Sequence, residues 1–497
     1  MPPRSSCDAA YRFGSEKVYR MRQMPLFVDL DGTLIRTDML YESFLGRLRH
    51  DLLIPFKALI WLPAGKAALK SRIAEGFEFA PELLPYNASV ISHIRAARDE
   101  GRLVYLATAS HKSIAERIAA HLGLFDGVIA SDAHENMAGR SKLEAIVALA
   151  QGVPFEYVGN STADIPVWEK AATVTAVAPD AAASRWLQSQ PGPPHVLPVD
   201  PLPSAPRAAI KALRLHQWLK NLLIFLPVVA AHKLFSPAAL VASAVAFIAF
   251  GLCASAVYLI NDMVDLAADR NHLKKRNRPF ASGALPLSFG FSLAPVLFLV
   301  AFAIGLLLPP QFVAMLLAYV AITFAYSFVL KRKLVIDVLA LAGLYTMRIL
   351  AGAAAIAVVP SFWLLAFSMF IFFGLALMKR FAELSAAGAQ GKTAAAGRNY
   401  QVADMPVVMA TGIASCFMCV LVLALYINSP DVAKLYRHPS WIWLLCPLLL
   451  YWITRVWALA QRGLMDEDPV VFAARDRVSL VLAGIGAVIV VLSTRGF

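Results

Sequence analysis

Charge is scarce in this sequence. Only 16% of its 497 residues are Asp, Glu, Lys or Arg, whereas 59% are hydrophobic and the mean hydropathy is +0.61. This composition is too apolar for one soluble fold, and the length suggests two or three domains. The scarcity is uneven, because residues 1–206 are mixed in composition and the chain from 207 onward consists mostly of long apolar runs. We therefore expect a soluble head followed by a membrane body.

Cysteine is also rare, with five in the whole chain, four of them in apolar runs. We expect no disulfide framework, and we interpret the CxxC pair Cys416 and Cys419 as two small apolar residues one helical turn apart. The N-terminal tail, residues 1–24, lacks an apolar core of signal-peptide length. We therefore expect the head to stay in the cytoplasm.

The apolar runs predict an all-α membrane domain over residues 207–497. A helix needs about 20 apolar residues to cross a bilayer, and nine segments come close to that length. The nine predicted spans are 216–232, 237–260, 286–308, 311–330, 334–358, 361–379, 404–428, 439–461 and 478–495. The first is the weakest, because polar side chains occupy its start.

Positive charge is distributed unevenly among the loops between these spans. With the head inside, the internal loops hold 16 Lys and Arg residues; these loops are 261–285, 331–333, 379–403 and 455–477. The external segments hold four, which are Lys233, Lys434, Arg437 and Arg495. The positive-inside rule then predicts a multi-pass protein of the inner (plasma) membrane, with the head at the cytoplasmic side and the C-terminus outside.

Proline separates the two parts. Residues 191–206 hold seven prolines and predict a stiff, extended linker. The stretch RAAIKALRLHQWLKN that follows alternates cations with apolar residues, which favours a juxtamembrane helix held by anionic headgroups. Phosphate contacts from Lys220 and Asn221 are the alternative.

The densest charge of the membrane body lies between two apolar runs, in NDMVDLAADRNHLKKRNRP (261–279). Asp262, Asp265 and Asp269 are spaced so that they share one face of a helix. Three carboxylates repel one another, and Mg²⁺ would relieve the repulsion because it takes carboxylate, water and phosphate oxygens. A charged cytoplasmic loop explains the cations of this stretch but not its three carboxylates.

NDMVDLAADRNHLKKRNRPFASG resembles the first aspartate-rich motif of the UbiA superfamily of intramembrane prenyltransferases, and the resemblance covers residues 207–497. It implies nine helices and Mg²⁺ held by Asp262, Asp265 and Asp269 against a substrate diphosphate. The neighbouring candidates for substrate binding are Asn261, Lys275, Arg276 and Arg278.

A second aspartate pair of DxxxD type, usual in aromatic prenyltransferases of this family, does not follow Asp269. The segments LHQWLKNLLIFLP, LMKRFAEL and DPVVFAARDRVSL resemble instead decaprenyl-phosphate phosphoribosyltransferases. That resemblance implies phosphoribosyl pyrophosphate as donor and a polyprenyl phosphate as acceptor. Further candidates for substrate binding are Tyr326, Lys331, Arg332, Asp337, Arg348, Lys379, Arg380 and Glu383. Positive-inside topology explains Lys331 and Arg332 equally well, and the charges of the last internal loop have no assigned role.

The head carries four short motifs in order, each with a carboxylate, hydroxyl or cation. They are PLFVDLDGTL (25–34), LVYLATAS (103–110), GRSKLEAI (139–146) and FEYVGNSTAD (155–164). Strands alternate with helical stretches, as a doubly wound parallel sheet requires. The order resembles the haloacid-dehalogenase superfamily, mostly phosphatases, and predicts a Rossmann-like α/β domain over 25–190. Residues 38–80 predict a small helical cap whose apolar side chains form its core, with some facing a lipid substrate or the membrane.

The resemblance implies a role for each motif. Asp29 attacks phosphorus, Asp31 is the general acid and base, and Thr108 and Lys142 hold the phosphoryl oxygens. The implied Mg²⁺ ligands are Asp29, the carbonyl of Asp31, Asn160 and Asp164. The family usually has Asp at the position of Asn160, which puts the strength of this metal site in question.

Two candidate active sites on one chain suggest two consecutive steps. The membrane domain would transfer 5-phosphoribosyl to a polyprenyl phosphate, and the head would remove the 5-phosphate from the lipid-linked product. The alternatives are prenylation of a hydroxybenzoate or quinone precursor beside an accessory or inactive head, a catalytically silent membrane scaffold, and a transporter. Clustering of the polar residues at one face argues against a transporter. The expected partners are the membrane, a polyprenyl lipid and a diphosphate donor, with no nucleic acid.

Overall fold

A computed structural model describes residues 24–199, 203–394, 398–430, 432, 436, 438–465 and 468–493. The tail 1–23, linker residues 200–202 and the charges Lys434, Arg437 and Arg495 lie outside the described residues. The chain divides into two compact units. The head unit comprises Met1–Ala212 with Ile260–Ser292, and the helical unit comprises Leu213–Leu259 with Leu293–Phe497.

The head unit is built on a six-stranded parallel sheet in the order β3-β2-β1-β4-β5-β6. The strands are β1 (Leu26–Val28), β2 (Val104–His111), β3 (Gly127–Ser131), β4 (Glu156–Gly159), β5 (Thr173–Val177) and β6 (His195–Leu197). This confirms the predicted α/β class. The strand β2 runs three residues past Thr108.

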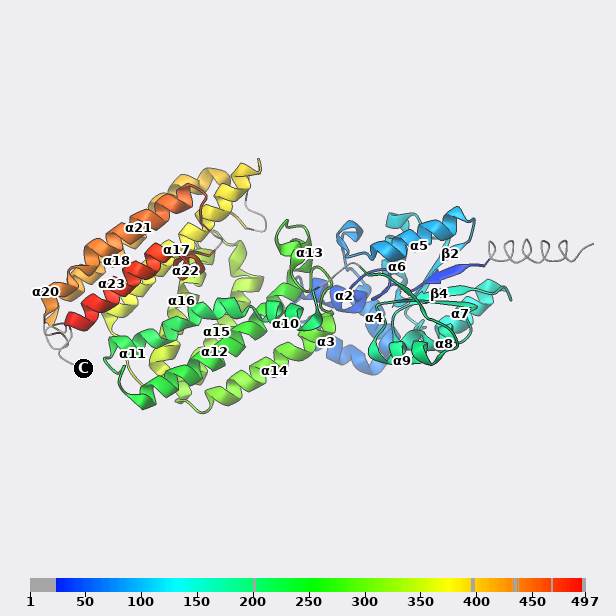
Figure 1. The fold of residues 1–497 in the computed structure, drawn as a ribbon, viewed down its shortest axis with the longest axis horizontal. Coiled ribbons are helices and arrows are strands. Elements are labelled where there is room, and N and C mark those ends of the chain that lie inside the picture. Colours follow the sequence, from blue (N-terminus) through cyan, green and yellow to red (C-terminus); the bar gives the residue numbers. More distant parts are fainter. Residues whose placement is uncertain are drawn as a thin grey trace, which may run out of the picture. The chain divides into compact units, whose positions relative to one another are not determined.

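Helices cover both faces of the sheet. Successive side chains of a strand point to opposite faces, and here apolar side chains lie on both faces. Leu26 and Val28 pack with α5 (Ala88–Asp99) and α6 (Lys112–Leu122). Phe27 packs on the other face, against α7 (Arg140–Ala150), α8 (Ile165–Trp168) and α9 (Ala181–Ser189). Figure 1 shows the two helical layers on opposite sides of the strands.

The Pro-rich stretch is not extended linker throughout. Residues His195–Leu197 form β6 and pair with β5 through the register Ala176↔Val196. The prediction of a linker over 191–206 is therefore wrong for these three residues. An edge strand tolerates the flanking prolines, since one of its sides needs no hydrogen-bond partners.

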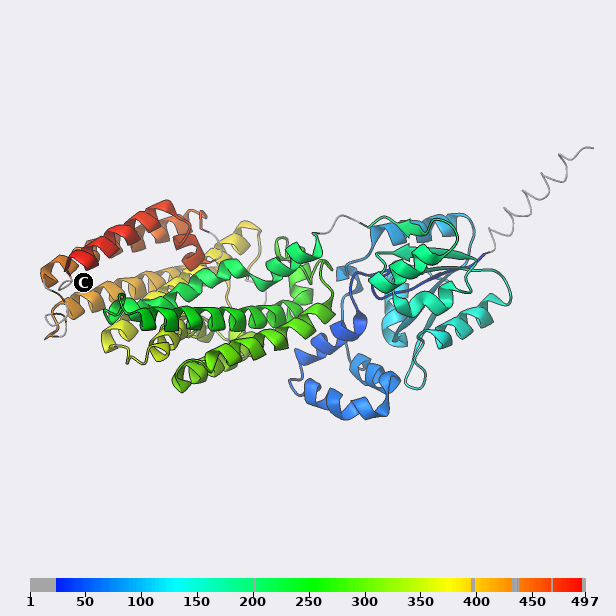
Figure 2. The same ribbon diagram turned by 60° about the horizontal axis from the view of Figure 1, so that its bottom comes forward.

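A helical cap lies between β1 and β2, as predicted. It consists of α2 (Met39–Leu48), α3 (Ile54–Trp61), η1 (Leu62–Ala64) and α4 (Lys66–Ala74), and Figure 2 shows these helices in blue, apart from the strands. At α3 most of the apolar side chains lie outside the cap core, as the alternative for this segment allows. Only Ile54 of that helix is buried, whereas Phe56, Leu59 and Ile60 are exposed.

The segment Ile260–Ser292 belongs to the head unit and packs on α2. It contains α13 (Leu266–Arg270) and η5 (Lys275–Asn277). Arg270 donates from Nη1 and Nη2 to the two carboxylate oxygens of Glu42, at 2.9 and 2.6 Å. Both side chains of this ion pair are buried, so it is shielded from the screening that weakens surface pairs.

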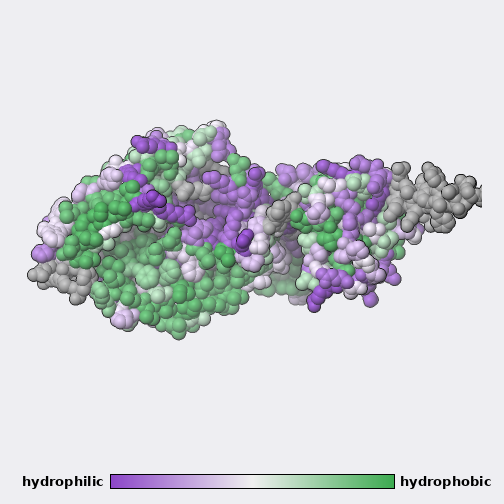
Figure 3. All heavy atoms as spheres, viewed as in Figure 1, coloured by the Kyte–Doolittle hydropathy of each residue, from purple (hydrophilic) through white to green (hydrophobic). Residues whose placement is uncertain are grey.

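The helical unit consists of long apolar helices, and Figure 3 shows its visible face largely in green. Among the described residues seven helices are long and apolar enough to cross a membrane. They are α12 (Pro237–Val264), α14 (Leu287–Gly305), α15 (Pro310–Phe328), α16 (Ile336–Ala355), α17 (Phe362–Ala389), the segment Val402–Ile427 with η7 (Val402–Asp404) and α18 (Met405–Ile427), and the segment Pro439–Gln461 with α20 (Pro439–Ile442) and α21 (Leu445–Gln461).

The predicted number of nine spans is not confirmed. The segment 216–232 forms η4 (Leu215–Phe225) and the five-residue α11 (Leu226–Ala230) in place of one long helix. Lys220 and Asn221 are buried and hydrogen-bonded there, so this segment satisfies polar groups that a lipid-facing helix could not carry. The last span, α23 (Arg477–Ser493), has 17 residues, and α17 continues ten residues past its predicted end at 379.

The helices approach closely where small residues face one another. A Cβ on Gly374 of α17 would collide with Cys416 of α18, so the glycine permits this contact. Cys416 and Cys419 are buried and free. Their position in the core between helices agrees with the interpretation of the CxxC pair as small apolar packing residues.

Candidate functional site

The phosphatase motifs of the head meet at the carboxyl ends of β1, β2 and β4. Asp29 follows β1 directly, and Lys142 of α7 donates from Nζ to its Oδ1 at 2.8 Å. The hydroxyl of Thr33 lies 3.4 Å from Asp29 Oδ2 and 3.3 Å from Asn160 Oδ1. Residues more than 100 positions apart are therefore gathered at one sheet edge, as expected for parallel strands.

The environment of Asp31 suits a proton donor. Its Oδ1 accepts from the backbone N–H of Met39 at 2.8 Å, and its Oδ2 accepts from Ser110 Oγ at 2.6 Å. Burial raises the pKa of Asp31 to about 8, with further contributions from Asp38 and Asp29. Burial also raises the pKa of Asp29 to about 6, against the opposing effect of Lys142. Burial thus favours retention of a proton within the Asp29–Asp31 pair, which a general acid requires.

Asp164 holds the motif IV loop together. Its Oδ2 accepts from the N–H groups of Asn160 and Ser161, both at 3.0 Å, and from Ser161 Oγ at 3.1 Å. Its Oδ1 accepts from Tyr157 at 2.7 Å and from Lys142 at 3.3 Å. These five contacts occupy both oxygens, so the geometry favours a positioning role. Direct metal ligation by Asp164 stays a prediction.

The oxygen atoms present fit a Mg²⁺ ion at this edge of the head. Asp29 Oδ2 and Asn160 Oδ1 converge on the same hydroxyl, and Mg²⁺ prefers oxygen ligands of this kind. Gly32, with φ +76°, leaves room for the Asn160 side chain, which a Cβ at that position would strike. Among the described residues no group of three or more His, Cys, Asp or Glu could hold a metal. The ligand set would therefore depend on an amide and a backbone carbonyl.

A second cation approaches the head site from the cap. Lys70 of α4 donates to the carbonyl of Ala109 at 2.7 Å and to Asn136 Oδ1 at 2.8 Å. Burial lowers its pKa, whereas the carboxylates of Asp31 and Asp38 act in the opposite direction. The sequence analysis missed Lys70, because no local pattern distinguishes it from the other cations of the cap.

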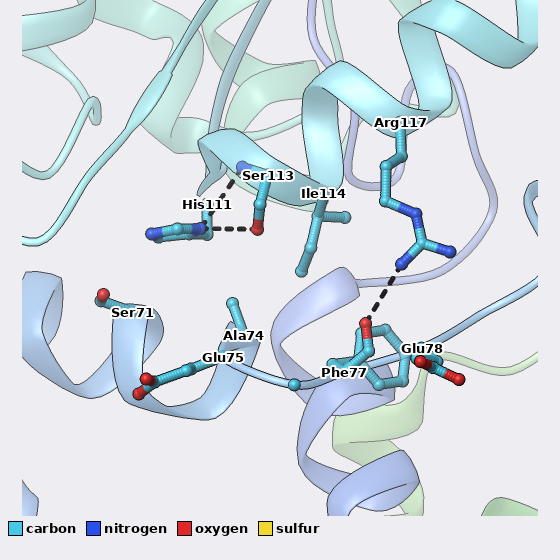
Figure 4. A pocket seen from close by; sticks show the side chains of 10 residues that line it. Ser71, Ala74, Glu75, Phe77, Glu78, His111, Ser113, Ile114 and Arg117 are labelled. Atoms are coloured by element: carbon cyan, nitrogen blue, oxygen red, sulfur yellow. Dashed lines mark hydrogen bonds between the residues drawn. The ribbon is translucent and has the colours of Figure 1, made fainter.

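A pocket of about 580 Å³ opens between the cap and α6 (Figure 4). The end of α4 and the loop after it supply Glu75, Phe77 and Glu78, and the start of α6 supplies Ser113. Arg117 ties these walls together by donating to the carbonyl of Phe77 at 3.3 Å. The head therefore has a polar recess formed partly by the cap.

The aspartate motif lies at the end of α12 and in α13. Asp262 is on the last turn of α12, and Asp269 is on α13. The single helix face expected for the three carboxylates is interrupted at Asp265, where α12 has ended and α13 has not begun. The backbone N–H of Asp265 nevertheless donates to the carbonyl of Asn261, and the N–H of Asp269 donates to the carbonyl of Asp265, both at 2.9 Å. These are the hydrogen bonds of a helix, so the spacing of the three carboxylates stays close to helical.

Arg278 joins two of these carboxylates. Its Nη1 lies 3.2 Å from Asp262 Oδ1 and 2.6 Å from Asp269 Oδ2, and both aspartates are buried. Burial raises the pKa of Asp269 to about 6, and Arg278 opposes this rise. The Arg278 guanidinium thus occupies the position between the two carboxylates. In the part of the chain that the structure describes, no group of three or more His, Cys, Asp or Glu could hold a metal, so ligation of Mg²⁺ by the three aspartates of the motif stays a prediction. Lys275 and Arg276 lie in η5, on the chain just before Arg278.

The helical unit contains a cluster centred on Asp468, at the N-cap of α22 (Pro469–Ala473). Asp468 pairs with Lys220 and lies 3.7 Å from Lys379 Nζ. Tyr345 also donates to it, at 3.3 Å. Burial would raise the pKa of Asp468, but the ammonium groups of Lys220 and Lys379 hold it at about 2. Two lysines that share one carboxylate leave net positive charge, which suits an anionic ligand.

Arg348 lies among aromatic rings of the same unit. Its Nε donates to Asn221 Oδ1 at 2.9 Å, and its guanidinium is 5.3 to 5.7 Å from the ring centres of Phe250, Tyr319 and Tyr345. Cation–π contacts of this kind stabilise a buried arginine. The predicted pair Lys220 and Asn221 thus lies with Arg348 and the Asp468 cluster.

A further cluster in the helical unit surrounds Asp337. Arg380 donates from Nε to Asp337 at 2.6 Å and from Nη2 to Tyr326 at 3.2 Å. Arg398 Nη1 lies 3.5 Å from Asp337 Oδ2, and the Tyr400 hydroxyl donates to Asp337 Oδ1 at 2.8 Å. Asp337 therefore faces cations. Its role in substrate binding, like that of Lys331 in η6 (Leu330–Arg332), stays a prediction.

Comparison with known proteins decides the family. The family model of UbiA prenyltransferases matches residues 222–476, which is more than half of the chain, and that of haloacid dehalogenase-like hydrolases matches residues 26–169. The chain belongs to the UbiA prenyltransferase family. Seven apolar helices and this membership make it an integral membrane protein. The resemblances of the membrane domain to the UbiA superfamily and of the head to the haloacid-dehalogenase superfamily are confirmed.

Three relatives cover different parts of this UbiA family member. The uncharacterized protein y4nM of Sinorhizobium fredii is 36% identical over 465 residues, covering 92% of this chain and 89% of that protein. Nodulation protein NoeC of Azorhizobium caulinodans is 34% identical, and the match covers 54% of this chain and 88% of that protein. Decaprenyl-phosphate phosphoribosyltransferase of Mycobacterium tuberculosis is 35% identical over 186 residues, which are 37% of this chain and 62% of that protein.

Several polar residues of the UbiA domain and of the haloacid-dehalogenase-like (HAD-like) head make contacts that were not predicted from the sequence. Asp468 precedes a proline, a signal for a helix N-cap, but nothing local connects it with Lys220, 248 positions away. Arg398 and Tyr400 lie in a loop that the sequence analysis treated only as an internal segment. Ser110 lies within a quoted motif and was overlooked because Thr108 carries the family resemblance.

Proposed function

We propose that the UbiA domain transfers 5-phosphoribosyl from phosphoribosyl pyrophosphate to a polyprenyl phosphate. The observation that carries the proposal is the partial similarity to decaprenyl-phosphate phosphoribosyltransferase over 186 residues. The residues agree with it, since one aspartate motif serves one diphosphate and the sequence has no second DxxxD pair after Asp269. The lysines around Asp468 are candidates for the monophosphate of the lipid.

The reaction joins a phosphate oxygen of the lipid to the anomeric carbon of the sugar. The bond from that carbon to pyrophosphate breaks, and its electron pair leaves with the pyrophosphate. Asp262, Asp265 and Asp269 would hold Mg²⁺, which would neutralise charge on the leaving group. Arg278, half-buried beside Asp262 and Asp269, would support the same charge by donating hydrogen bonds.

The HAD-like head would then remove the 5-phosphate from the lipid-linked product. Asp29 attacks phosphorus, the bond to the sugar oxygen breaks, and Asp31 protonates that oxygen. Asp31 next takes a proton from water, which attacks the aspartyl phosphate and releases inorganic phosphate. Thr108 and Lys142 hold the phosphoryl oxygens, and Lys142 already contacts Asp29. The Mg²⁺ fitted by Asp29 and Asn160 would neutralise phosphoryl charge.

Two features support consecutive steps. The phosphatase motifs and the aspartate motif belong to the same compact unit, and the positive-inside rule predicts the cytoplasmic side for both. Covalent linkage raises the effective concentration of the second site near the product. Prenylation of an aromatic acceptor is the alternative reaction for the same aspartate motif.

Substrate choice tests the transferase proposal. Purified protein in lipid, supplied with Mg²⁺, polyprenyl phosphate and labelled phosphoribosyl pyrophosphate, should move label into the lipid phase. A prenyl diphosphate should compete poorly, because the second aspartate pair that would hold it is missing from the sequence. Prenylation of an aromatic acid without any labelled lipid would contradict the proposal and leave the family assignment intact.

Asn160→Asp should strengthen the metal site of the head. The added carboxylate replaces a neutral amide oxygen, and ligand charge tunes divalent affinity, so the Mg²⁺ concentration for half-maximal dephosphorylation should fall roughly tenfold. Gln151→Glu adds the same charge at an exposed position of the head and should change nothing. If both variants match the wild type across a Mg²⁺ titration, Asn160 does not limit metal binding.

A further inference from the structure

The cap presents an apolar face to solvent. Ile54 anchors α3 in the cap core, while Phe56, Leu59 and Ile60 lie on the opposite side at helical spacing. Together with the neighbours of α3, six large apolar side chains are 52 to 75% exposed; they are Leu52, Leu53, Phe56, Leu59, Ile60 and Leu62. Contiguous exposed patches of this kind mark interaction surfaces, whereas scattered ones do not.

The fold holds this face in place. Helix α3 contacts both α2 and α4, and the guanidinium of Arg72 lies 5.7 Å from the ring centre of Trp61 at the end of α3. Trp61 and Ile54 therefore pack toward the inside of the cap. The exposed side chains do not contribute to that packing, so the stability of the cap does not explain them.

The segment that carries the apolar face has an excess of positive charge, although Lys70 within it points to the head site. Residues 47–72 contain six Lys and Arg and one acidic residue, Asp51, which pairs with Lys57 at 2.6 Å. Lys66, next to η1, is exposed. An apolar helix flanked by excess positive charge complements a bilayer surface that carries anionic headgroups.

The same compact unit contains the ends of two membrane helices. Phe291, on the second turn of α14, contacts Tyr41 and Phe44 of α2, with ring centres 4.9 and 5.8 Å apart. Because α14 is a membrane helix, α2 packs where that helix meets the bilayer surface. Helix α3 begins at Ile54, six residues after α2 ends, which is within reach of that surface.

We propose that α3 and η1 insert into the headgroup region of the bilayer, with Phe56, Leu59 and Ile60 toward the acyl chains. The occupant of this face is lipid, and the insertion makes the cap an interfacial anchor for the head. This assignment does not depend on which phosphate the head removes. It gives the head a fixed depth at the surface where a lipid-borne substrate would present its polar end.

A fluorescent probe at α3 tests the proposal in the full-length protein. In a Cys7→Ser background, in which the remaining four cysteines are buried, the environment-sensitive dye NBD is attached to Ile60→Cys. The matched control is Val147→Cys on α7, which is also exposed but lies outside the cap. Each protein is placed alone in a nanodisc that contains phosphatidylglycerol, and the background protein without an introduced cysteine corrects for native labelling.

The probe at 60 should emit at shorter wavelength than the probe at 147, lose intensity with doxyl-labelled lipids and resist aqueous iodide. The probe at 147 should show the reverse. Equal iodide quenching at both sites would overturn the proposal. So would protection that occurs only in crowded vesicles and disappears in single-protein nanodiscs, since a second copy would then cover α3.

A double variant separates lipid contact from burial by protein. Phe56→Asp with Leu59→Asp should abolish doxyl quenching at 60, and Val147→Asp should leave it unchanged. Because these side chains point away from the cap core, the double variant should elute and melt like the parent protein. Doxyl quenching that persists in the folded double variant would show that the apolar face does not make the contact.

Discussion

Asp29→Asn should stop dephosphorylation while ribosyl transfer to lipid continues, so that the 5-phosphorylated lipid accumulates. The substitution removes the attacking oxygen and keeps the volume of a buried side chain. Lys142 retains Asp164 as a partner at 3.3 Å, which limits damage to the fold. Loss of a nucleophile typically costs at least about 10³-fold in turnover. The measurement is the ratio of phosphorylated to dephosphorylated lipid after labelling with phosphoribosyl pyrophosphate.

The control for this experiment is Asp99→Asn, an exposed carboxylate at the end of α5. It removes the same charge from a solvent-exposed position of the head, outside the four motifs, and should leave the ratio at the wild-type value. An identical ratio in wild type and Asp29→Asn would mean that the head does not process this lipid. Transfer itself would remain intact in that case, so the two proposed activities can fail separately.

The head was largely predictable because its site follows from topology. The carboxyl ends of adjacent parallel strands meet at one edge, so motifs in the right order suffice to bring Asp29 and Asn160 to the same hydroxyl. The sequence gives no comparable rule for the cap. Lys70 and the exposed face of α3 depend on how three short helices pack, and apolar spacing alone does not tell a core face from a lipid-facing one.

The helical unit was predictable in its spans and not in its polar contacts. Hydropathy locates long apolar helices because lipid requires them. It predicted a span over residues 216–232, where the structure has η4 and α11 with Lys220 and Asn221 buried and hydrogen-bonded in protein. The pairs Lys220–Asp468 and Arg380–Asp337 join positions 248 and 43 apart. Only tertiary packing brings such partners together, whereas Arg278 and Asp269 are nine positions apart and lie within one quoted motif.

Asp262→Asn should abolish transfer to lipid, whichever donor the UbiA domain uses. The variant removes a charged oxygen from the predicted Mg²⁺ site and keeps the side-chain volume. Arg278 still pairs with Asp269 at 2.6 Å, so the local fold should persist. Loss of metal-assisted stabilisation of the leaving group is worth several kcal/mol, which corresponds to roughly 10²-fold or more in rate. The measurement is the initial rate of label transfer at a series of Mg²⁺ concentrations.

The Mg²⁺ series distinguishes a ligand from a structural partner of Arg278. If Asp262 binds the metal, high Mg²⁺ should recover part of the lost rate in Asp262→Asn. If it serves only as a partner of Arg278, added Mg²⁺ should leave the rate of Asp262→Asn unchanged. Asp404→Asn, which removes the cap of η7, should transfer at the wild-type rate. Full activity of Asp262→Asn at low Mg²⁺ would exclude the metal assignment, because a buried carboxylate at the centre of the motif would then be dispensable.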